Sequence, residues 1–267
     1  MKFSVLMSLY FKEKPEYLTE CFESLKNQTV QADEIVVVVF DGAITPELEQ
    51  VMQNFAEILP LNIVRLEQNQ GLGKALNHGL IHCINEWVFR MDTDDICIPE
   101  RFEKQIAFIE QNPDTIIFGG QIAEFGSDIN DIVSYRRVPT ETKAIVEFTQ
   151  KRCPFNHMTV AYQKSAVLEC GGYQDLQEDY YLWIKLVALG KKVANLPEIL
   201  VYARVGNGMV GRRCGIAQAK AEWRLFKLKH QVGMQNVVSG FITFTMRVIP
   251  RLLPTVLLTQ FYKLLRK

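Results

Sequence analysis

The stretch WVFRMDTDD, residues 87–95, joins a short apolar run to three acidic residues. The run from Trp87 to Met91 is short and is followed by polar residues, which is typical of a buried strand. Three similar runs precede it, at residues 3–9, 34–40 and 61–66. Apolar residues at helical spacing lie between the runs. Strands that alternate with helices predict an α/β fold with a mostly parallel central sheet and helices on both of its faces.

Polar residues follow each of these predicted strands directly. In parallel sheets, ligands bind outside the carboxyl ends of the strands, where the loops converge. This rule selects four segments as candidate site residues: Tyr10 to Glu13, Asp41 with Gly42, Glu67 to Asn69, and Asp92 to Asp95.

The acids Asp92, Asp94 and Asp95 repel one another unless a cation or solvent compensates their charge. Mg²⁺ and Mn²⁺ commonly take one or two carboxylates and leave their other positions to substrate phosphates. The acidic run therefore predicts a divalent cation that is shared with a nucleotide diphosphate. The alternative is an Asp-rich turn that caps a helix beginning near Pro99.

The rest of the chain shows fewer regular patterns. The pattern predicts a helix from Pro99 to Gln111, a strand over residues 115–122, and a second helix over 177–189 that Gly190 ends. Residues 124–163 are irregular. Six scattered cysteines show no zinc or disulfide spacing, so we expect a reduced, cytoplasmic compartment. The simplest organisation is one domain, residues 1–213, with a C-terminal helical extension, residues 214–267.

The N-terminal three quarters of the chain resembles the large family 2 of inverting glycosyltransferases with the GT-A fold, in particular transferases of amylovoran, capsule and lipooligosaccharide synthesis. The motifs that carry the resemblance run in order from residue 2 to about 205. They are SVLMS at residues 4–8, Gln28-Thr29, Glu34 to Val39 with Asp41-Gly42, NQGL at 69–72, RMDTDD at 90–95, Pro99, Arg101, PFNH at 154–157, GGY at 171–173, and Glu178-Asp179 with Leu182-Trp183.

On the donor side, the resemblance implies that Asp41 meets the uracil or ribose and that Asp94 ligates Mn²⁺ or Mg²⁺. Asp92 and Asp95 then contact ribose, donor sugar or metal, so Asp95 is a second candidate metal ligand. Phe40 stands where many family members carry another acid. The implied nucleotide-binding residues are Ser8, Leu9, Tyr10, Lys12, Glu13, Asp41, Asn69, Gly71, Lys74 and Asp92.

On the acceptor side, a hydroxyl is a poor nucleophile at neutral pH, and a positioned carboxylate removes its proton during attack. The resemblance implies that Asp179 is this general base, while Glu178 orients it or meets the acceptor. The alternative is that both acids only favour the first turn of a helix. His157 is expected to orient or pack against its neighbours. Contact with the acceptor is the only direct functional role that we predict for it.

Three arginines lie in or beside a glycine-punctuated stretch, residues 205–211. Arg204, Arg212 and Arg213 are predicted to belong to a flexible lid that brings positive charge to the diphosphate. The alternative is that they are ordinary surface arginines.

The formal net charge is zero, but the residues after Glu222 hold eight Lys or Arg and no Asp or Glu. Their apolar stretches are shorter than the roughly 20 residues that span a bilayer. We therefore expect a basic amphipathic segment that lies on anionic lipid at the inner face of the cell membrane. The alternative is a helix packed on the domain. Nucleic acid is not an expected partner because apolar residues dominate the segment.

Together these features predict a metal-dependent, inverting and non-processive transfer of galactose or N-acetylglucosamine. The expected donor is a UDP-sugar and the expected acceptor is a lipid-linked sugar or lipooligosaccharide. A sugar nucleotidyltransferase and a non-catalytic nucleotide-sugar-binding protein are the alternatives, and a hydrolase with paired carboxylates is a more distant one.

Overall fold

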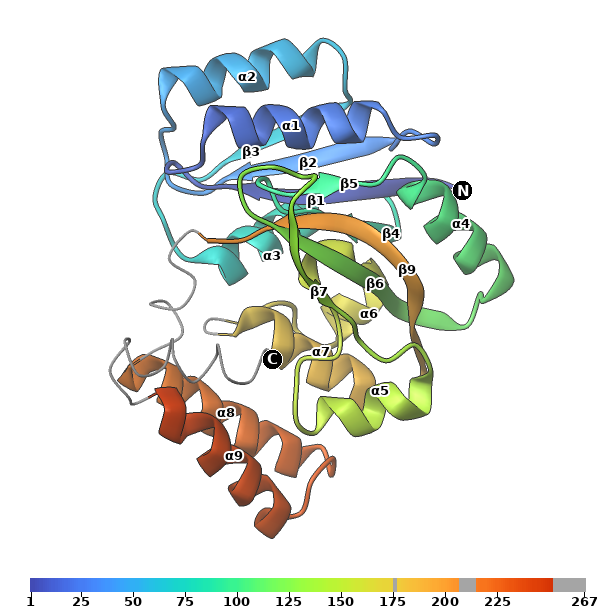
Figure 1. Ribbon diagram of the computed structural model, residues 1–267, viewed down its shortest axis with the longest axis vertical. Coiled ribbons are helices and arrows are strands. Elements are labelled where there is room, and N and C mark those ends of the chain that lie inside the picture. Colours follow the sequence, from blue (N-terminus) through green and yellow to red (C-terminus); the bar gives the residue numbers. More distant parts are fainter. Residues whose placement is uncertain (175–176, 207–214, 252–267) are drawn as a thin grey trace.

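The computed structural model describes residues 1–174, 177–206 and 215–251 (Figure 1). The strands are β1 (Phe3–Leu9), β2 (Glu34–Val39), β3 (Leu61–Arg65), β4 (Trp87–Arg90), β5 (Ile96–Cys97), β6 (Thr115–Phe125), β7 (Ile132–Arg136), β8 (Ala161–Gln163) and β9 (Lys192–Arg204). The helices are α1 (Pro15–Lys26), α2 (Pro46–Ala56), α3 (Leu72–His82), α4 (Arg101–Gln111), α5 (Thr142–Thr149), the 3-10 turn η1 (His157–Thr159), α6 (Lys164–Glu169), α7 (Glu178–Ala188), α8 (Ile216–Gln231) and α9 (Val237–Arg251).

One sheet runs through the molecule in the order β3-β2-β1-β4-β8-β6-β9-β5, and β7 pairs with β6 outside this path. The strands β3, β2, β1 and β4 are parallel and correspond to the four apolar runs of the sequence. Beyond β4 the pairing is mixed: β8 is antiparallel to β4 and β6, whereas β6 and β9 are parallel. The first 90 residues therefore form the parallel half of the sheet. The carboxyl ends of its strands position the loops that follow β1, β2, β3 and β4.

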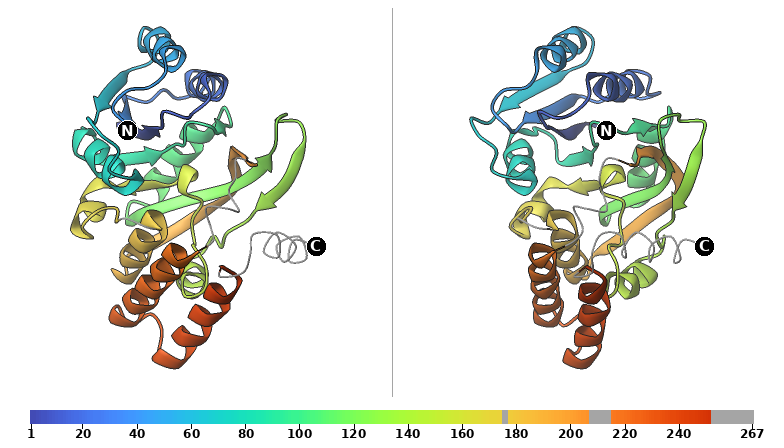
Figure 2. Two further views of the ribbon diagram at one scale, coloured as in Figure 1. Left: turned by 90° about the vertical axis from the view of Figure 1, so that its left-hand side faces the viewer. Right: turned by 60° about the vertical axis from the view of Figure 1, so that its left-hand side comes forward.

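Strand β1 is buried along its whole length because both of its faces are covered. Phe3, Val5 and Met7 pack into a core shared with α1, α2 and α4, whereas Leu6 belongs to the core formed with α3, α6 and α7. Alternate side chains of a strand point to opposite faces. Figures 1 and 2 show helices on either side of the sheet, so the predicted α/β fold is confirmed.

The stretch 124–163 had no clear pattern in the sequence because its elements are short or lie at the edge. β7 pairs with β6 through a register shift at Glu124 and Phe125, and its side chains are half-buried or exposed. β8 contributes three residues and η1 three. Such segments show too few turns or pleats for a period to appear.

The helices α8 and α9 form a pair at one end of the molecule (Figures 1 and 2). α8 packs on α7 through Tyr180, Ile184, Leu225 and Leu228. α9 packs on α8, and Arg247 donates to the buried carboxylate of Glu222. Within the described ranges, no helix has the length and apolar character needed to cross a bilayer.

Helix α3 approaches the sheet closely at Gly79. A Cβ atom at this position would lie 2.3 Å from Leu6 Cδ1 and 2.6 Å from Val38 Cγ2. The absence of a side chain therefore sets the distance between α3 and the strands whose loops build the site.

We predict that Gly79→Val lowers the free energy of unfolding by about 2–3 kcal/mol, because the new side chain overpacks the core. Urea denaturation measures the change. His78→Val is the matched control, since His78 is the preceding, exposed residue of the same helix. A Gly79→Val variant as stable as wild type would contradict the close packing.

Candidate active site

The loops after β1, β2 and β3 meet at Asp41. Its carboxylate accepts a hydrogen bond from the Phe11 backbone N–H at 3.1 Å and another from the Asn69 side-chain amide. Asn69 in turn accepts from the Gly71 N–H at 2.8 Å, just before α3. The structure thus brings Asp41, the loop of residues 10–13 and residues 69–71 together, as their positions at strand ends predicted.

Gly42 makes this convergence sterically feasible. Its φ of +84° is one that residues with a side chain rarely adopt, and an added Cβ would lie 2.7 Å from the Glu67 carbonyl oxygen. Beside it, Phe40 is buried and its ring stacks on Tyr10 at a centroid distance of 5.7 Å. Phe40 therefore packs beneath the loop and offers no polar contact from its side chain.

The guanidinium of Arg90 is fully buried at the end of β4 and organises the next part of the site. It donates to Asp92 Oδ1 at 2.5 Å, to the Met91 carbonyl at 2.7 Å and to His157 Nε2 at 3.1 Å. Because Nε2 accepts this hydrogen bond, His157 is neutral here. Burial, with a smaller contribution from Arg90, lowers the pKa of His157 to about 4. His157 therefore orients its neighbours and is protonated too weakly to supply a proton at neutral pH.

Among these acids, Asp94 and Asp95 have raised pKa values. Burial and, after it, the charges of Asp92 and Glu13 raise the pKa of Asp94 to about 7. Burial and the charge of Asp94 hold the pKa of Asp95 well above its usual range. Asp95 Oδ1 accepts from the Arg204 backbone N–H at 2.8 Å, whereas Oδ2 is buried without a hydrogen-bond partner.

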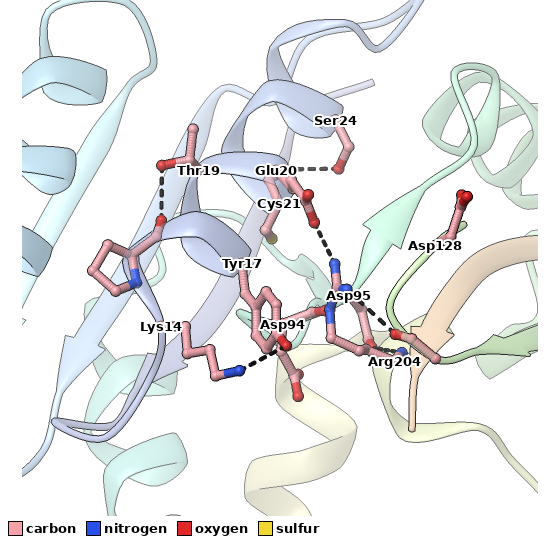
Figure 3. A network of polar contacts seen from close by, with 12 residues as sticks. Lys14, Tyr17, Thr19, Glu20, Cys21, Ser24, Asp94, Asp95, Asp128 and Arg204 are labelled. Atoms are coloured by element: carbon pink, nitrogen blue, oxygen red, sulfur yellow. Dashed lines mark hydrogen bonds and ion pairs between the residues drawn. The ribbon is translucent and has the colours of Figure 1, made fainter. Parts of the chain in front are cut away.

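Arg204 lies beside Asp94 and Asp95 and fixes this acidic loop (Figure 3). Its guanidinium donates to the Asp94 carbonyl at 3.2 Å, pairs with Glu20 on α1, and lies between the rings of Tyr17 and Phe125 at 3.9 and 4.5 Å. The prediction that Arg204 belongs to a flexible lid is wrong, because Arg204 is buried at the end of a strand. The residue ends strand β9 and its side chain is 3% exposed. The other two predicted lid arginines, at positions 212 and 213, lie outside the described residues.

A divalent cation fits the chemistry of this loop. The unpartnered Asp95 Oδ2 and the raised pKa of Asp94 are what desolvated carboxylates show when no cation compensates them. In the described part of the chain, however, no group of three or more His, Cys, Asp or Glu side chains is arranged to hold a metal. A cation here would need oxygen ligands from a bound phosphate, which is how Mg²⁺ sites are commonly completed.

Asp179 lies in the first turn of α7. It accepts from the Tyr180 N–H at 2.6 Å, and its Oδ2 is 3.8 Å from Cys153 Sγ. The charges of Asp92 and Asp179 both raise the pKa of His157 against the effect of burial. The structure therefore brings the acidic loop and the second acidic pair of the sequence to one place.

The backbone just before α7 is strained and is held by the C-terminal helices. Gln177 has a φ of +52°, and its side chain donates to Glu222 Oε1 at 3.1 Å. Such conformations cost about 1–3 kcal/mol and cluster at functional sites. Glu222 is 3% exposed and also binds Arg247 of α9, so α8 and α9 help to position the start of α7.

The other predicted nucleotide-binding residues lie at the end of β1, in the loop after it and at the start of α3. Glu13 accepts from the Thr93 hydroxyl at 2.8 Å and so joins the first loop to the acidic loop. Lys74 is exposed in the first turn of α3. A Cβ atom added at the neighbouring Gly73 would lie 3.4 Å from Glu178 Cβ. At the end of β1, Ser8 and Leu9 are buried, while Tyr10 and Lys12 are exposed.

Sequence reasoning missed the residues that hold the site together: Arg90, Glu20, Tyr17 and Gln177. Arg90 did carry a signal, since a charged residue inside an otherwise apolar strand must find partners when it is buried. The others are polar or aromatic residues at ordinary helix or loop positions. Nothing in their local sequence distinguishes them from surface residues.

A sequence model of the family described as glycosyl transferase family 2 matches residues 4–175. This range covers more than half of the chain and contains both the acidic loop and His157. Asp179 and the helices that follow it lie beyond the matched range.

Three relatives match along almost their whole length. An uncharacterised glycosyltransferase of Haemophilus influenzae is 70% identical over 98% of both chains. The amylovoran biosynthesis glycosyltransferase AmsE of Erwinia amylovora is 45% identical over 99% of both chains. An Escherichia coli UDP-Gal:α-D-GlcNAc-diphosphoundecaprenol β-1,3-galactosyltransferase is 36% identical over 98% of this chain and 95% of its own.

Among solved structures, residues 1–349 of Staphylococcus aureus TarS in complex with UDP-GlcNAc superpose with a TM-score of 0.68. The match covers 92% of this chain and 71% of that one at 20% sequence identity. At this identity the likeness establishes the fold.

We predict that Arg204→Lys lowers the free energy of unfolding by about 2–4 kcal/mol, because an ammonium cannot replace the planar contacts of a buried guanidinium. Urea denaturation measures this loss. Arg137→Lys serves as the control: Arg137 also lies over a tyrosine ring but is exposed, so its change should stay within about 0.5 kcal/mol. Full stability of the Arg204 variant would contradict the anchoring role.

Proposed function

Because the chain belongs to glycosyl transferase family 2, we propose that it transfers a sugar from a UDP-sugar to a lipid-linked acceptor with inversion of the anomeric centre. Its general activity as a glycosyltransferase of surface polysaccharide synthesis, and its GT-A fold, follow from the family and from relatives such as AmsE. The donor, the acceptor and the mechanism are the proposal.

The carrying observation is that the buried pair Arg90 and His157 connects two sets of carboxylates. Asp92 binds Arg90 directly, and both Asp92 and Asp179 lie near enough to His157 for their charges to act on it. An inverting transfer uses carboxylates for both partners, because the diphosphate leaves from one side of the anomeric carbon while the acceptor attacks from the other. One displacement then inverts the centre.

On the donor side, Asp41 and the loops it ties together are suited to hold the nucleoside, since their backbone and amide groups converge at the carboxyl ends of β1 to β3. Asp94, supported by Asp95, would hold Mn²⁺ or Mg²⁺, which when bound neutralises charge on the diphosphate. Galactose is the first candidate for the donor sugar, because the Escherichia coli relative uses UDP-Gal. N-acetylglucosamine is the second, because the TarS structure contains UDP-GlcNAc.

On the acceptor side, Asp179 takes the proton of the acceptor hydroxyl as its oxygen bonds to the anomeric carbon. The bond from that carbon to the diphosphate oxygen breaks, and UDP leaves with the electron pair. Arg90 donates to His157 Nε2 and the pKa of His157 is lowered to about 4, so the imidazole is a weak base and does not compete for the proton. The proposed acceptor is a sugar diphosphate on a polyprenol lipid, the acceptor type named for the same relative.

The distinguishing experiment measures which product is released. Incubation with a UDP-sugar and a lipid-linked sugar should release UDP and yield a longer glycolipid. Release of pyrophosphate from UTP and a sugar phosphate would instead indicate a nucleotidyltransferase, and binding without turnover would indicate a nucleotide-sugar-binding protein.

We predict that Asp179→Asn lowers kcat by at least about 100-fold, because the amide cannot accept the acceptor proton. The KM for the donor should change little, since Asp179 contributes to the chemical step. Steady-state UDP release measures both constants. The exposed Asp131→Asn is the control, and full turnover by the Asp179 variant would exclude this residue as the base.

We predict that a chelator abolishes turnover, that Mn²⁺ restores it, and that Asp94→Asn removes the extra thermal stability that UDP confers in the presence of Mn²⁺. Differential scanning fluorimetry with UDP, Mn²⁺ or both measures this stability. Asp114→Asn is the control because Asp114 is acidic, exposed and outside the acidic loop. Undiminished turnover in the chelator would exclude metal dependence.

A further inference from the structure

The outward face of α9 is apolar and has no partner within the described residues. Val238, Phe241, Ile242, Met246 and Ile249 are between 51% and 71% exposed. The pairs 238/241, 238/242, 242/246 and 246/249 are three or four residues apart, which places these side chains along one side of the helix. Five large apolar side chains on one helix face form a surface that water solvates poorly, and such patches mark interaction sites.

The opposite face of α9 is the one that packs on the protein. A Cβ added at Gly240 would lie 2.8 Å from the Phe226 ring, Phe244 packs edge-on against Trp223, and Arg247 binds Glu222. The position of α9 is therefore already fixed by its own core contacts. The exposed apolar side is surplus to the packing of the domain.

The charge of the two C-terminal helices selects the kind of partner. No acidic residue follows Glu222 in the sequence. Lys220, Arg224 and Lys227 are exposed along one stripe of the neighbouring α8, and Lys227 lies over the Trp223 ring. A helix pair with an apolar face on α9 and exposed basic side chains on α8 matches the interface of an anionic bilayer. A second copy of the chain fits less well, because two such basic surfaces repel each other.

We propose that α9 docks in the plane of an anionic membrane, with the face formed by Val238, Phe241, Ile242, Met246 and Ile249 buried among the lipids. The helix then lies along the bilayer surface, in keeping with the finding that no helix among residues 1–174, 177–206 and 215–251 is long and apolar enough to cross a membrane. This inference rests on the proposed function in one respect, that a lipid-linked acceptor gives the docking its purpose.

The same contacts connect the docked helix to the reaction centre. Glu222 binds Arg247 of α9 at 2.7 Å and Gln177, two residues before Asp179, at 3.1 Å. Glu222 is buried, so both contacts are shielded from water and ions. The membrane-facing helix is thereby held at a fixed position relative to the proposed base, as an enzyme acting on a membrane-held acceptor requires.

The test is co-sedimentation of the full chain with vesicles of phosphatidylcholine alone or with one third phosphatidylglycerol. Wild type should bind the anionic vesicles and bind more weakly as salt rises. The triple variant Val238→Gln, Ile242→Gln, Met246→Gln keeps helix-forming residues. Its affinity for the anionic vesicles should fall by at least roughly tenfold. The matched control, Ile58→Gln, Ile81→Gln, Ile84→Gln, removes three equally exposed apolar side chains elsewhere and should bind as wild type does.

Vesicle binding equal to wild type in the α9 variant, or no binding by wild type, would overturn the proposal. Sedimentation velocity without vesicles adds a further criterion. If wild type forms dimers and the α9 variant does not, the apolar face binds a second copy of the chain and the proposal is overturned. The Asp179→Asn variant separates the two hypotheses, because it should lose transfer and still bind vesicles. Wild type that binds vesicles but transfers no sugar would contradict the proposed function and leave the docking intact.

Discussion

The site depends on how the protein holds three carboxylates close together, with Asp95 buried and Asp92 and Asp94 partly buried. Two buried arginines hold the loop of residues 92–95. Arg90 pairs with Asp92, while Arg204 binds the loop backbone and ties it to Glu20 of α1. Neither guanidinium hydrogen-bonds the Asp94 carboxylate or Asp95 Oδ2. The fold thus leaves part of the negative charge uncompensated where a cation and a diphosphate would supply the balance.

This arrangement explains why the two halves of the chain form one site. The parallel half, β1 to β4, provides the loops that converge on Asp41, and its last strand ends in the acidic loop. The mixed half then returns β9 beside β5, which brings Arg204 against that loop, and α7 brings Asp179 near His157. In the proposed mechanism, the donor-side carboxylates thus come from the first 95 residues and the base from a later helix.

The sequence predicted the parts that local patterns encode. Four apolar runs became β1 to β4 with ends displaced by one residue at most, and the helix expected at 177–189 became α7. Asp41, Asn69 and the acidic loop meet because strand ends in a parallel sheet meet at one edge. Arg204 could not be placed correctly, since its partners Glu20 and Phe125 are 184 and 79 residues away in the chain and no local pattern reports such contacts. The mixed half was also obscure, because its short strands are specified by their neighbours in the sheet.

The central claim is a single displacement in which Asp179 acts as the base and the acidic loop supports the leaving diphosphate. The most direct test is the anomeric configuration of the product formed from an α-linked UDP-sugar, read from the coupling of its anomeric proton by nuclear magnetic resonance. A β-linked product is what one attack opposite the leaving diphosphate predicts. An α-linked product would contradict the account, because it needs either two successive displacements or attack from the side of the leaving group.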